Sequence, residues 1–219
     1  GWNFYDNSSD FSDSCGHGTT VAGVAAAMTD NGIGIAGIAW DNPIIPIKIT
    51  DSTCYGYYSA MAKGITYAAD KGARVANISF EIFNGHVLSN AAQYMNSKGG
   101  IVVAASGNTG TYESYSDNPY IISVGATDKY DNIASFSSFG PYVDFSAPGV
   151  AVYTTCLCNV VTVDSSGTHT STSYYMYASG TSFASPITAG AIALMFSANP
   201  TSTPDEVYDA LKISAVDLG

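Results

Sequence analysis

The chain has 219 residues, of which 46% are hydrophobic and 11% are charged. This length is enough to bury a large core, and the composition excludes a disordered chain. The net charge of −11 argues against a nucleic-acid or anionic-membrane partner, and no apolar run approaches the ~18 residues of a membrane span.

Helices and strands alternate through the first 126 residues. A polar loop at 1–10 precedes a helix of small residues at 16–28. Apolar strands separated by helices are typical of a parallel sheet with helices on both faces. We therefore predict an α/β fold in one domain, residues 1–219, with a mostly parallel central sheet between two helical layers. Strands are expected at 43–49, 74–80, 101–105 and 120–126, and helices at 57–71 and 87–98.

The last third of the chain is less regular. A short β segment is expected at 142–147, and a β-ribbon at 158–176, which is rich in Thr, Ser, Val and Tyr. The final helix begins at Thr203, with Pro204 at its first position and Glu206 completing a capping box.

Between the ribbon and the last helix, residues 182–195 form a helix that is apolar on every side, as expected of a core helix. Ser182 stands at its beginning, after Gly180, where free backbone amides and the helix dipole favour developing negative charge. We expect Pro186 near the first turn, where a missing backbone donor costs least. A lone Gly-Thr-Ser is usually only a helix start. Ser182 is therefore interpreted as a nucleophile only if a general base and an oxyanion donor are found elsewhere in the chain.

Two other segments supply those groups. His17 lies at the beginning of the helix of small residues, and Asn108 follows an apolar strand at the edge where parallel sheets place ligands. Each has an ordinary explanation, as a packed helix start and a turn residue. Together with Ser182 they form the base, amide donor and nucleophile that acyl transfer requires.

The four cysteines fit no zinc spacing and allow three disulfide pairings. Cys156 and Cys158 are too close in sequence for an easy bridge. Cysteine usage is therefore only a weak sign of an oxidising compartment.

The segments HGTTVAGVAAA, VANISF, VVAASGN, ASFSSFGPYVDFSAPG and SGTSFASPITAGAIALM resemble, in order, the motifs of the subtilisin-like serine proteases, or subtilases. The resemblance implies a three-layer subtilisin-like fold and a serine endopeptidase. His17 would be the general base, Ser182 the nucleophile and Asn108 an oxyanion-hole donor. It also implies polypeptide substrates, an upstream prosegment, a monomer and an extracellular location, although this chain shows no signal peptide.

The same resemblance places two substrate-binding segments, which would hold an extended peptide by strand addition. A pocket walled by 105–107, with the 113–118 loop opposite, is expected to accept an apolar or aromatic side chain before the scissile bond. Glu113 and Asp117 on that loop would add tolerance for Lys or Arg, while Glu81, where the family usually has Gly, is expected to alter outer subsites. The implied substrate-binding residues are Cys54, Tyr55, Gly56, Ser79, Phe80, Glu81, Ala105, Ser106 and Gly107.

A structural Ca²⁺ is also implied, because residues 29–35 resemble the calcium loop of many subtilases. Its ligands would be the Asn31 side chain and the carbonyls of Thr29, Ile33 and Ile35, which are hard oxygen donors. A plain Asn-Gly turn is the alternative. The family's remaining ligands lie upstream, so this segment is expected to bind weakly.

The third triad member, an Asp on an upstream strand, has no counterpart here. Asp6, Asp10 and Asp13 precede His17, but they lie in a polar stretch that we expect to be a solvated loop. We therefore expect a protease domain cut at both ends and nearly inactive alone. The alternatives are a non-catalytic, peptide-binding subtilase-like protein and, more remotely, an α/β-hydrolase esterase, which would want Gly rather than Ala184 two residues after the serine.

Overall fold

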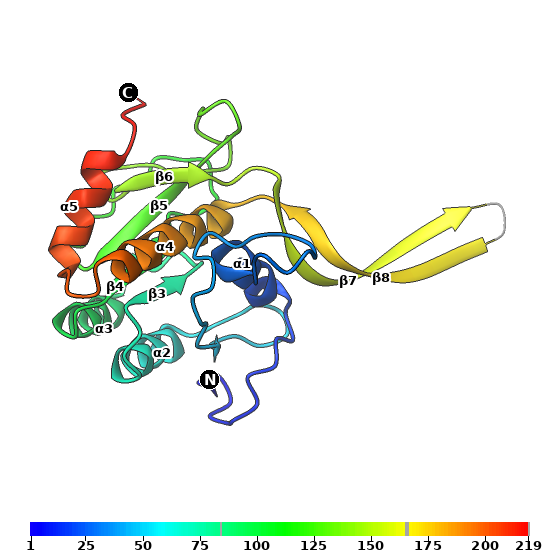
Figure 1. Ribbon diagram of the computed structural model, residues 1–219, viewed down its shortest axis with the longest axis horizontal. Helices are drawn as coiled ribbons and strands as arrows, with labels where there is room; N and C mark the ends of the chain where they lie inside the picture. Colours follow the sequence, from blue (N-terminus) through cyan, green and yellow to red (C-terminus); the bar gives the residue numbers. More distant parts are fainter. Residues whose placement is uncertain (84, 165–166, 219) are drawn as a thin grey trace.

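The computed structural model describes residues 1–83, 85–164 and 167–218, with the side chains of 159–172 outside the description. Figure 1 shows a compact body from which one β-ribbon projects. The elements in chain order are β1 (Trp2–Asn3), α1 (His17–Ala26), β2 (Ile47–Lys48), α2 (Tyr58–Asp70), β3 (Val75–Ile78), α3 (His86–Ser97), β4 (Ile101–Ala105), β5 (Ile121–Thr127), β6 (Phe145–Pro148), β7 (Val152–Asp164), β8 (Gly167–Ala178), α4 (Thr181–Ala198) and α5 (Pro204–Ser214).

A four-stranded parallel sheet, in the order β3-β4-β5-β6, forms the centre of the body. Every residue of β4 and β5 is buried. These strands lack the polar alternation of a half-exposed sheet because both of their faces are covered.

The two faces of the sheet pack against different helices. Val102 and Ala104 of β4 pack in a core with residues of α2 and α3, whereas Ile101 and Val103 pack with residues of α4 and α5. Alternate side chains of a strand point to opposite faces, so β4 contributes to both cores. The arrangement confirms the predicted three-layer α/β fold (Figure 1).

Helix α4 is the core helix of one layer. It contacts all four strands of the central sheet. By length and composition alone it would be able to cross a membrane, but 56% of it is buried inside the protein. Its apolar surface is thus explained by packing.

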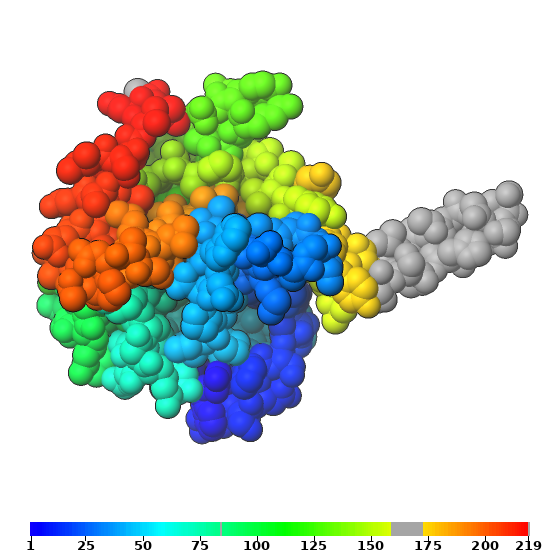
Figure 2. Space-filling view, in the orientation of Figure 1, coloured from blue at the N-terminus to red at the C-terminus, as the bar shows by residue number. Residues whose placement is uncertain are grey.

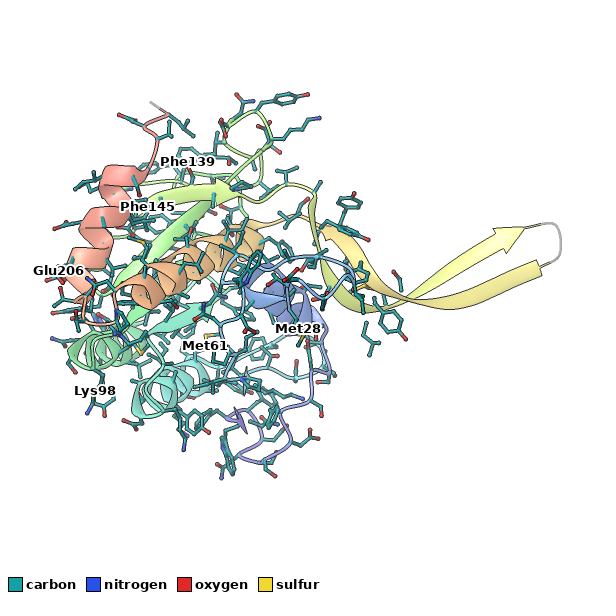
Figure 3. The ribbon with its side chains drawn as sticks, viewed as in Figure 1. Met28, Met61, Lys98, Phe139, Phe145 and Glu206 are labelled. Atoms are coloured by element: carbon teal, nitrogen blue, oxygen red, sulfur yellow. A yellow bond between two sulfur atoms is a disulfide. The ribbon has the colours of Figure 1, made fainter. Side chains whose placement is uncertain are left out.

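Helix α5 begins with the predicted capping box. Thr203 Oγ1 accepts a hydrogen bond from Glu206 N at 3.2 Å, and Glu206 Oε2 accepts one from Thr203 N at 2.8 Å. Glu206 lies at the beginning of the helix in Figure 3.

The strand expected at 43–49 is mostly absent. Only Ile47 and Lys48 form β2, and they pair with β1 inside the segment expected to be a loop. Pro43 and Pro46 have no backbone donor, so this stretch cannot sustain a ladder over its whole length.

The predicted β-ribbon is longer than expected. Its strands β7 and β8 pair antiparallel, with Tyr153 opposite Tyr177, while residues 165 and 166 lie outside the description. Thr154 and Thr155 fix its base to α1 by donating to the carbonyls of Thr20 at 2.6 Å and Thr19 at 2.8 Å. Figure 2 shows this base, in yellow, leaving the body beside the blue N-terminal part.

The cysteines form two disulfides. Cys15 pairs with Cys54, with Cα atoms 5.3 Å apart, and Cys156 pairs with Cys158, with Cα atoms 5.5 Å apart. Cys156 and Cys158 were expected to be too close in sequence for an easy bridge, yet they form one. The register of β7 and β8 shifts between Thr155 and Cys158, so the two cysteines lie at an irregularity of the ribbon.

Candidate active site

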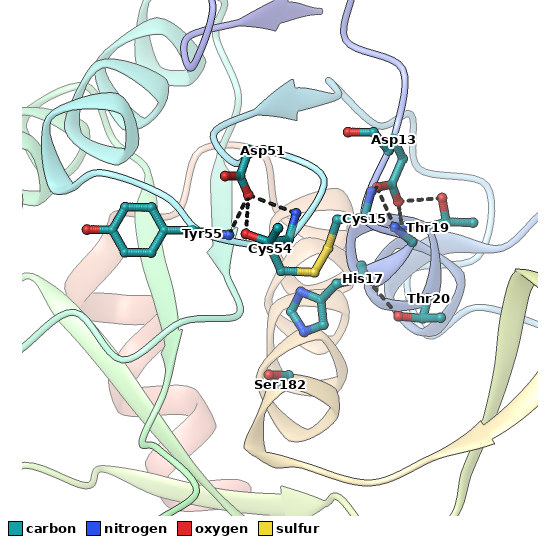
Figure 4. Close-up of a disulfide and its surroundings, with 12 residues drawn as sticks. Asp13, Cys15, His17, Thr19, Thr20, Asp51, Cys54, Tyr55 and Ser182 are labelled. Atoms are coloured by element: carbon teal, nitrogen blue, oxygen red, sulfur yellow. Dashed lines mark hydrogen bonds between the residues drawn. A yellow bond between two sulfur atoms is a disulfide. The ribbon is translucent and has the colours of Figure 1, made fainter.

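Asp13 builds the turn that presents His17. Its Oδ1 accepts from Cys15 N at 3.0 Å and Gly16 N at 2.7 Å, and its Oδ2 accepts from Thr19 N and Thr19 Oγ1, both at 2.7 Å (Figure 4). Burial alone would raise the pKa of Asp13, but the hydrogen bonds from Thr19, Gly16 and Cys15 together lower it. Asp13 is thus an exposed loop residue, as expected, but both of its carboxylate oxygens accept hydrogen bonds from the turn before α1.

His17 is the first residue of α1, and its ring lies between two aromatic side chains. The ring centroids of Phe80 and Phe183 are 5.6 Å and 6.2 Å away. Burial lowers the pKa of His17, and the negative charge of Asp13 only partly opposes this. Among the described residues, no side chain forms a hydrogen bond with the ring. The site therefore favours a neutral imidazole, which is the form that can act as a base.

Ser182 is the second residue of α4 and lies beside the imidazole of His17 (Figure 4). Its hydroxyl donates to the carbonyl of Ser79 at 3.2 Å. Both Ser182 and His17 line one cavity of about 300 Å³. Rotation about the Cα–Cβ bond of Ser182 would redirect its hydroxyl into this shared space.

Pro186 lies near the first turn of α4, as expected, but just beyond it, because α4 begins at Thr181 and Pro186 is its sixth residue. A proline inside a helix leaves the carbonyl four residues earlier without its donor, and here that is the carbonyl of Ser182. Ser79 Oγ donates to this carbonyl at 2.8 Å. The hydroxyl of Ser79 thus replaces the missing helical bond and ties the end of β3 to the beginning of α4.

Asn108 follows β4 and is held by its oxygen. Its Oδ1 accepts from Thr181 N at 2.9 Å and from Thr181 Oγ1 at 3.1 Å. The amide nitrogen is then the end that can donate, and Asn108 lines the same cavity as Ser182. The first amides of a helix also have no intrahelical acceptor, so the backbone N–H of Ser182 is a second donor at this position.

Most of the expected substrate-binding residues line this cavity, but three do not. Tyr55 is exposed and packs edge-on against Tyr57, Gly56 forms a β-bridge with Thr50, and the buried Ser106 Oγ donates to the carbonyl of Ser138 at 3.1 Å. The cavity is lined by Cys54, Ser79, Phe80, Glu81, Ala105 and Gly107 together with His17, Asn108, Thr181 and Ser182.

Sequence reasoning missed two features of the site. Phe183 packs against His17, and Cys54 is bonded to Cys15, two residues before His17. The position of Cys15 beside the base was a usable signal, whereas nothing local in the sequence indicated the orientation of Phe183.

A second, larger cavity of about 780 Å³ lies between β2 and β3. Strand β3 is an edge of the central sheet. The walls are mostly apolar and include Ile47, Ala76 and Ile78, and the cavity reaches His17. An extended segment here would run beside a sheet edge and lead to the imidazole.

The loop expected to bind calcium provides only part of a site. Asp30, Gly32 and Gly34 have positive φ angles, and Asn31 Oδ1 already accepts a hydrogen bond from Ile33 N at 3.0 Å. The described residues contain no cluster of three or more His, Cys, Asp or Glu suited to a metal. One amide oxygen and three carbonyls fall short of the roughly six to eight oxygens that Ca²⁺ takes.

The subtilase family model (peptidase S8) matches residues 1–219. The chain belongs to the subtilase family. It is 42% identical over 202 residues to thermitase from Thermoactinomyces vulgaris, covering 90% of this chain and 67% of thermitase. It is also 42% identical over 200 residues to a thermophilic serine proteinase from Bacillus sp. (strain AK1), covering 90% of this chain and 46% of that protein.

A solved structure, the crystal structure of a cold adapted subtilisin-like serine proteinase, has the same fold. It superposes with a TM-score of 0.80 at 29% identity, covering 100% of this subtilase and 74% of that chain. The family inferred from the sequence motifs is thus confirmed, as is the subtilisin-like fold. This subtilase spans less than half of one of its relatives and about two thirds of the other.

Proposed function

We propose that this subtilase is a serine endopeptidase in which His17 is the general base, Ser182 the nucleophile and Asn108 an oxyanion-hole donor. One observation carries the proposal: these three side chains come from α1, α4 and the end of β4, yet they line a single cavity. A base, a hydroxyl and an amide donor around one space are the groups that peptide-bond hydrolysis needs.

The chemistry follows from this arrangement. Ser182 Oγ attacks the peptide carbonyl while a ring nitrogen of His17 takes the hydroxyl proton. The carbonyl oxygen gains negative charge, which the Asn108 amide and the Ser182 backbone N–H stabilise. The protonated His17 then gives its proton to the leaving amine. Water repeats the sequence on the acyl-enzyme and releases the acid product.

No carboxylate of the described residues is hydrogen bonded to the ring of His17, and both oxygens of Asp13 accept bonds from its own turn. We propose that an upstream strand fills the 780 Å³ cavity beside β3 and ends in an Asp beside His17. Without that carboxylate, turnover is expected to fall by roughly 10⁴-fold, a magnitude known from serine proteases that include subtilisin itself.

The rival hypothesis is a non-catalytic, peptide-binding subtilase. It is favoured by the lack of any described carboxylate hydrogen bonded to the ring of His17. A fluorophosphonate probe separates the two on a protein extended upstream to include an Asp-bearing strand. We expect labelling and peptide hydrolysis that Ser182→Ala abolishes. Ser214→Ala is the matched control, since Ser214 lies exposed at the end of α5 and lines neither cavity. Absence of both labelling and hydrolysis would support the rival.

Removing the Asn108 donor gives a second, graded test. Asn108→Leu is expected to lower kcat by roughly 10²–10³ while labelled protein still forms slowly. That magnitude is borrowed from subtilisin, a member of the same family. A variant as active as the parent would remove Asn108 from the oxyanion hole.

The remaining proposals concern the location of the protein, its partners and its metal. Two disulfides support an extracellular, oxidising location. We also propose polypeptide substrates, an upstream prosegment, a monomer, and a Ca²⁺ held by the 29–35 loop together with further oxygens from outside it.

A further inference from the structure

The carboxylate of Glu81 extends across the active-site cavity. Glu81 lines the same space of about 300 Å³ as His17 and Ser182. A Cβ atom placed on Gly107 would lie 2.6 Å from Glu81 Oε2. The side chain therefore reaches from one wall of the cavity, 79–81, to the other, 105–107, at the position that the absent side chain of Gly107 leaves free.

A neighbouring tyrosine fixes this carboxylate. Tyr115 from the 113–118 loop donates its hydroxyl to Glu81 Oε1 at 2.9 Å. The ring of Tyr115 packs against Phe83 and Tyr142, with centroids 6.3 Å and 5.2 Å away. One oxygen of Glu81 is thus held in place, and the other faces the wall at Gly107.

The surroundings of this carboxylate are negative. Burial, then the charges of Glu81 and Glu113, raise the pKa of Tyr142, whose hydroxyl donates to the Ser106 carbonyl at 2.6 Å. Within the described part of the chain, no Lys or Arg forms an ion pair with Glu81. Its charge thus has no counter-ion among the described Lys and Arg side chains.

We infer that Glu81 selects substrates with Lys or Arg immediately before the scissile bond. This inference rests on the proposed endopeptidase function and replaces the expected apolar or aromatic preference. An Arg or Lys side chain entering between the two walls would meet Glu81 Oε2, and charge-assisted hydrogen bonds of this kind are the strong ones. An apolar side chain would instead desolvate this carboxylate without providing a positive charge for it, which is unfavourable.

The test compares two peptides that differ only in having Arg or Phe before the scissile bond, hydrolysed by the full-length protein. The parent is expected to favour Arg. Glu81→Gln keeps the shape of the side chain and an acceptor for Tyr115 but removes the charge. It should lower the Arg-to-Phe ratio of kcat/KM by roughly ten- to hundredfold, the value of a hydrogen bond to a charged group.

Asp209→Asn is the control, since it removes one negative charge away from the site. Asp209 is exposed on α5 and does not line the cavity. Its ratio should stay within about twofold of the parent. A parent that prefers Phe or Ala, or a ratio that moves with Asp209→Asn but not with Glu81→Gln, would overturn the inference.

Fluorophosphonate labelling distinguishes this failure from failure of the proposed function, because the probe needs no side chain in the pocket. Labelled protein with no Arg preference refutes the role of Glu81 alone. Protein that neither labels nor cleaves refutes the endopeptidase and, with it, the selectivity. As a second readout, a peptide aldehyde ending in Arg should block labelling of the parent at lower concentration than one ending in Phe, and Glu81→Gln should reverse or erase that order.

Discussion

Ser79 and Ser182 exchange two hydrogen bonds: Ser79 Oγ donates to the Ser182 carbonyl at 2.8 Å, and Ser182 Oγ donates to the Ser79 carbonyl at 3.2 Å. The first bond exists because Pro186 cannot supply the helical donor for that carbonyl. The pair joins the end of β3, where substrate is expected to bind, to the nucleophile. A core-packing feature of α4 thus also positions the candidate site.

The first prediction is a double-mutant cycle on this pair. Ser79→Ala leaves the Ser182 carbonyl without a donor and should cost about 1–3 kcal/mol of unfolding free energy. Pro186→Ala restores a backbone donor, so Ser79→Ala should cost about 1 kcal/mol less in that background. Ser79 Oγ also accepts from Asn77 Nδ2 at 3.0 Å, and this loss occurs in both backgrounds and cancels. Urea denaturation measures all four proteins, and additive costs would contradict the account.

The second prediction concerns the pH dependence of Ser182 labelling. Burial depresses the pKa of His17 below its ordinary value of 6.5, so the neutral base persists to lower pH. For the 219-residue protein, the rate of fluorophosphonate labelling should fall as the pH is lowered, with a midpoint below pH 6.5. His17→Ala should be slow at every pH. A midpoint near 7 or above would show that a carboxylate holds the imidazole.

The third prediction is that the two disulfides differ in their contribution to the free energy of unfolding. Cys15 and Cys54 are 39 residues apart, and Cys156 and Cys158 are 2 apart. Loop-closure entropy then predicts losses of about 4 and about 1 kcal/mol for replacing each pair with serine. Each double variant is the control for the other in urea denaturation. Equal losses would mean that native packing, not chain entropy, dominates.

The central architecture was predictable because it depends on local patterns. The helix expected at 57–71 is α2 at Tyr58–Asp70, and the strand expected at 101–105 is β4 exactly as bounded. Hydrophobic periodicity and glycine stops carry these signals within a short window.

The differences from expectation have two causes. The short strand within 43–49 has a local cause, Pro43 and Pro46, which the sequence already displayed, whereas the residue at which α4 begins depends on where the preceding ribbon ends. The direction of the Glu81 side chain, toward Gly107 and Tyr115, is set by packing between segments more than twenty residues apart. Residue type alone gave no indication of it.

The fourth prediction tests calcium. If the 29–35 loop binds Ca²⁺ in the full-length protein, a chelator should lower Tm, and Asn31→Ala should remove the difference between chelated and calcium-loaded samples. Saturation at about 100 times Kd would be worth about 2.7 kcal/mol. Asn31→Ala also loses the bond from Ile33 N, so the comparison is of the calcium response within each protein. If the chelator does not change the Tm of the parent, the protein has no such site.

The last prediction is a pH effect on stability from Asp144, which lies between the central sheet and α5. Its Oδ2 accepts from Ser123 N at 2.8 Å, and its Oδ1 accepts from the Tyr208 hydroxyl at 3.1 Å. Burial is the main cause that raises the pKa of Asp144 from 3.8 to about 6, and the charge of Asp117 adds to it. The hydrogen bonds from Ser123 and Tyr208 and the charge of Lys212 act in the opposite direction.

The sign follows from proton binding. Between about pH 4 and pH 6, Asp144 keeps its proton in the folded state but loses it in the unfolded state. Stability contributed by this group therefore falls as pH rises through that window, and it stays low above about pH 6. Asp144→Asn is neutral at every pH and, with its amide turned suitably, keeps partners for both Ser123 N and the Tyr208 hydroxyl. Its stability relative to the parent should thus increase from pH 4 to pH 6.5 and then level off. Urea denaturation of both proteins across this range provides the measurement, and a difference that does not change with pH would mean that Asp144 is already charged in the folded protein at low pH.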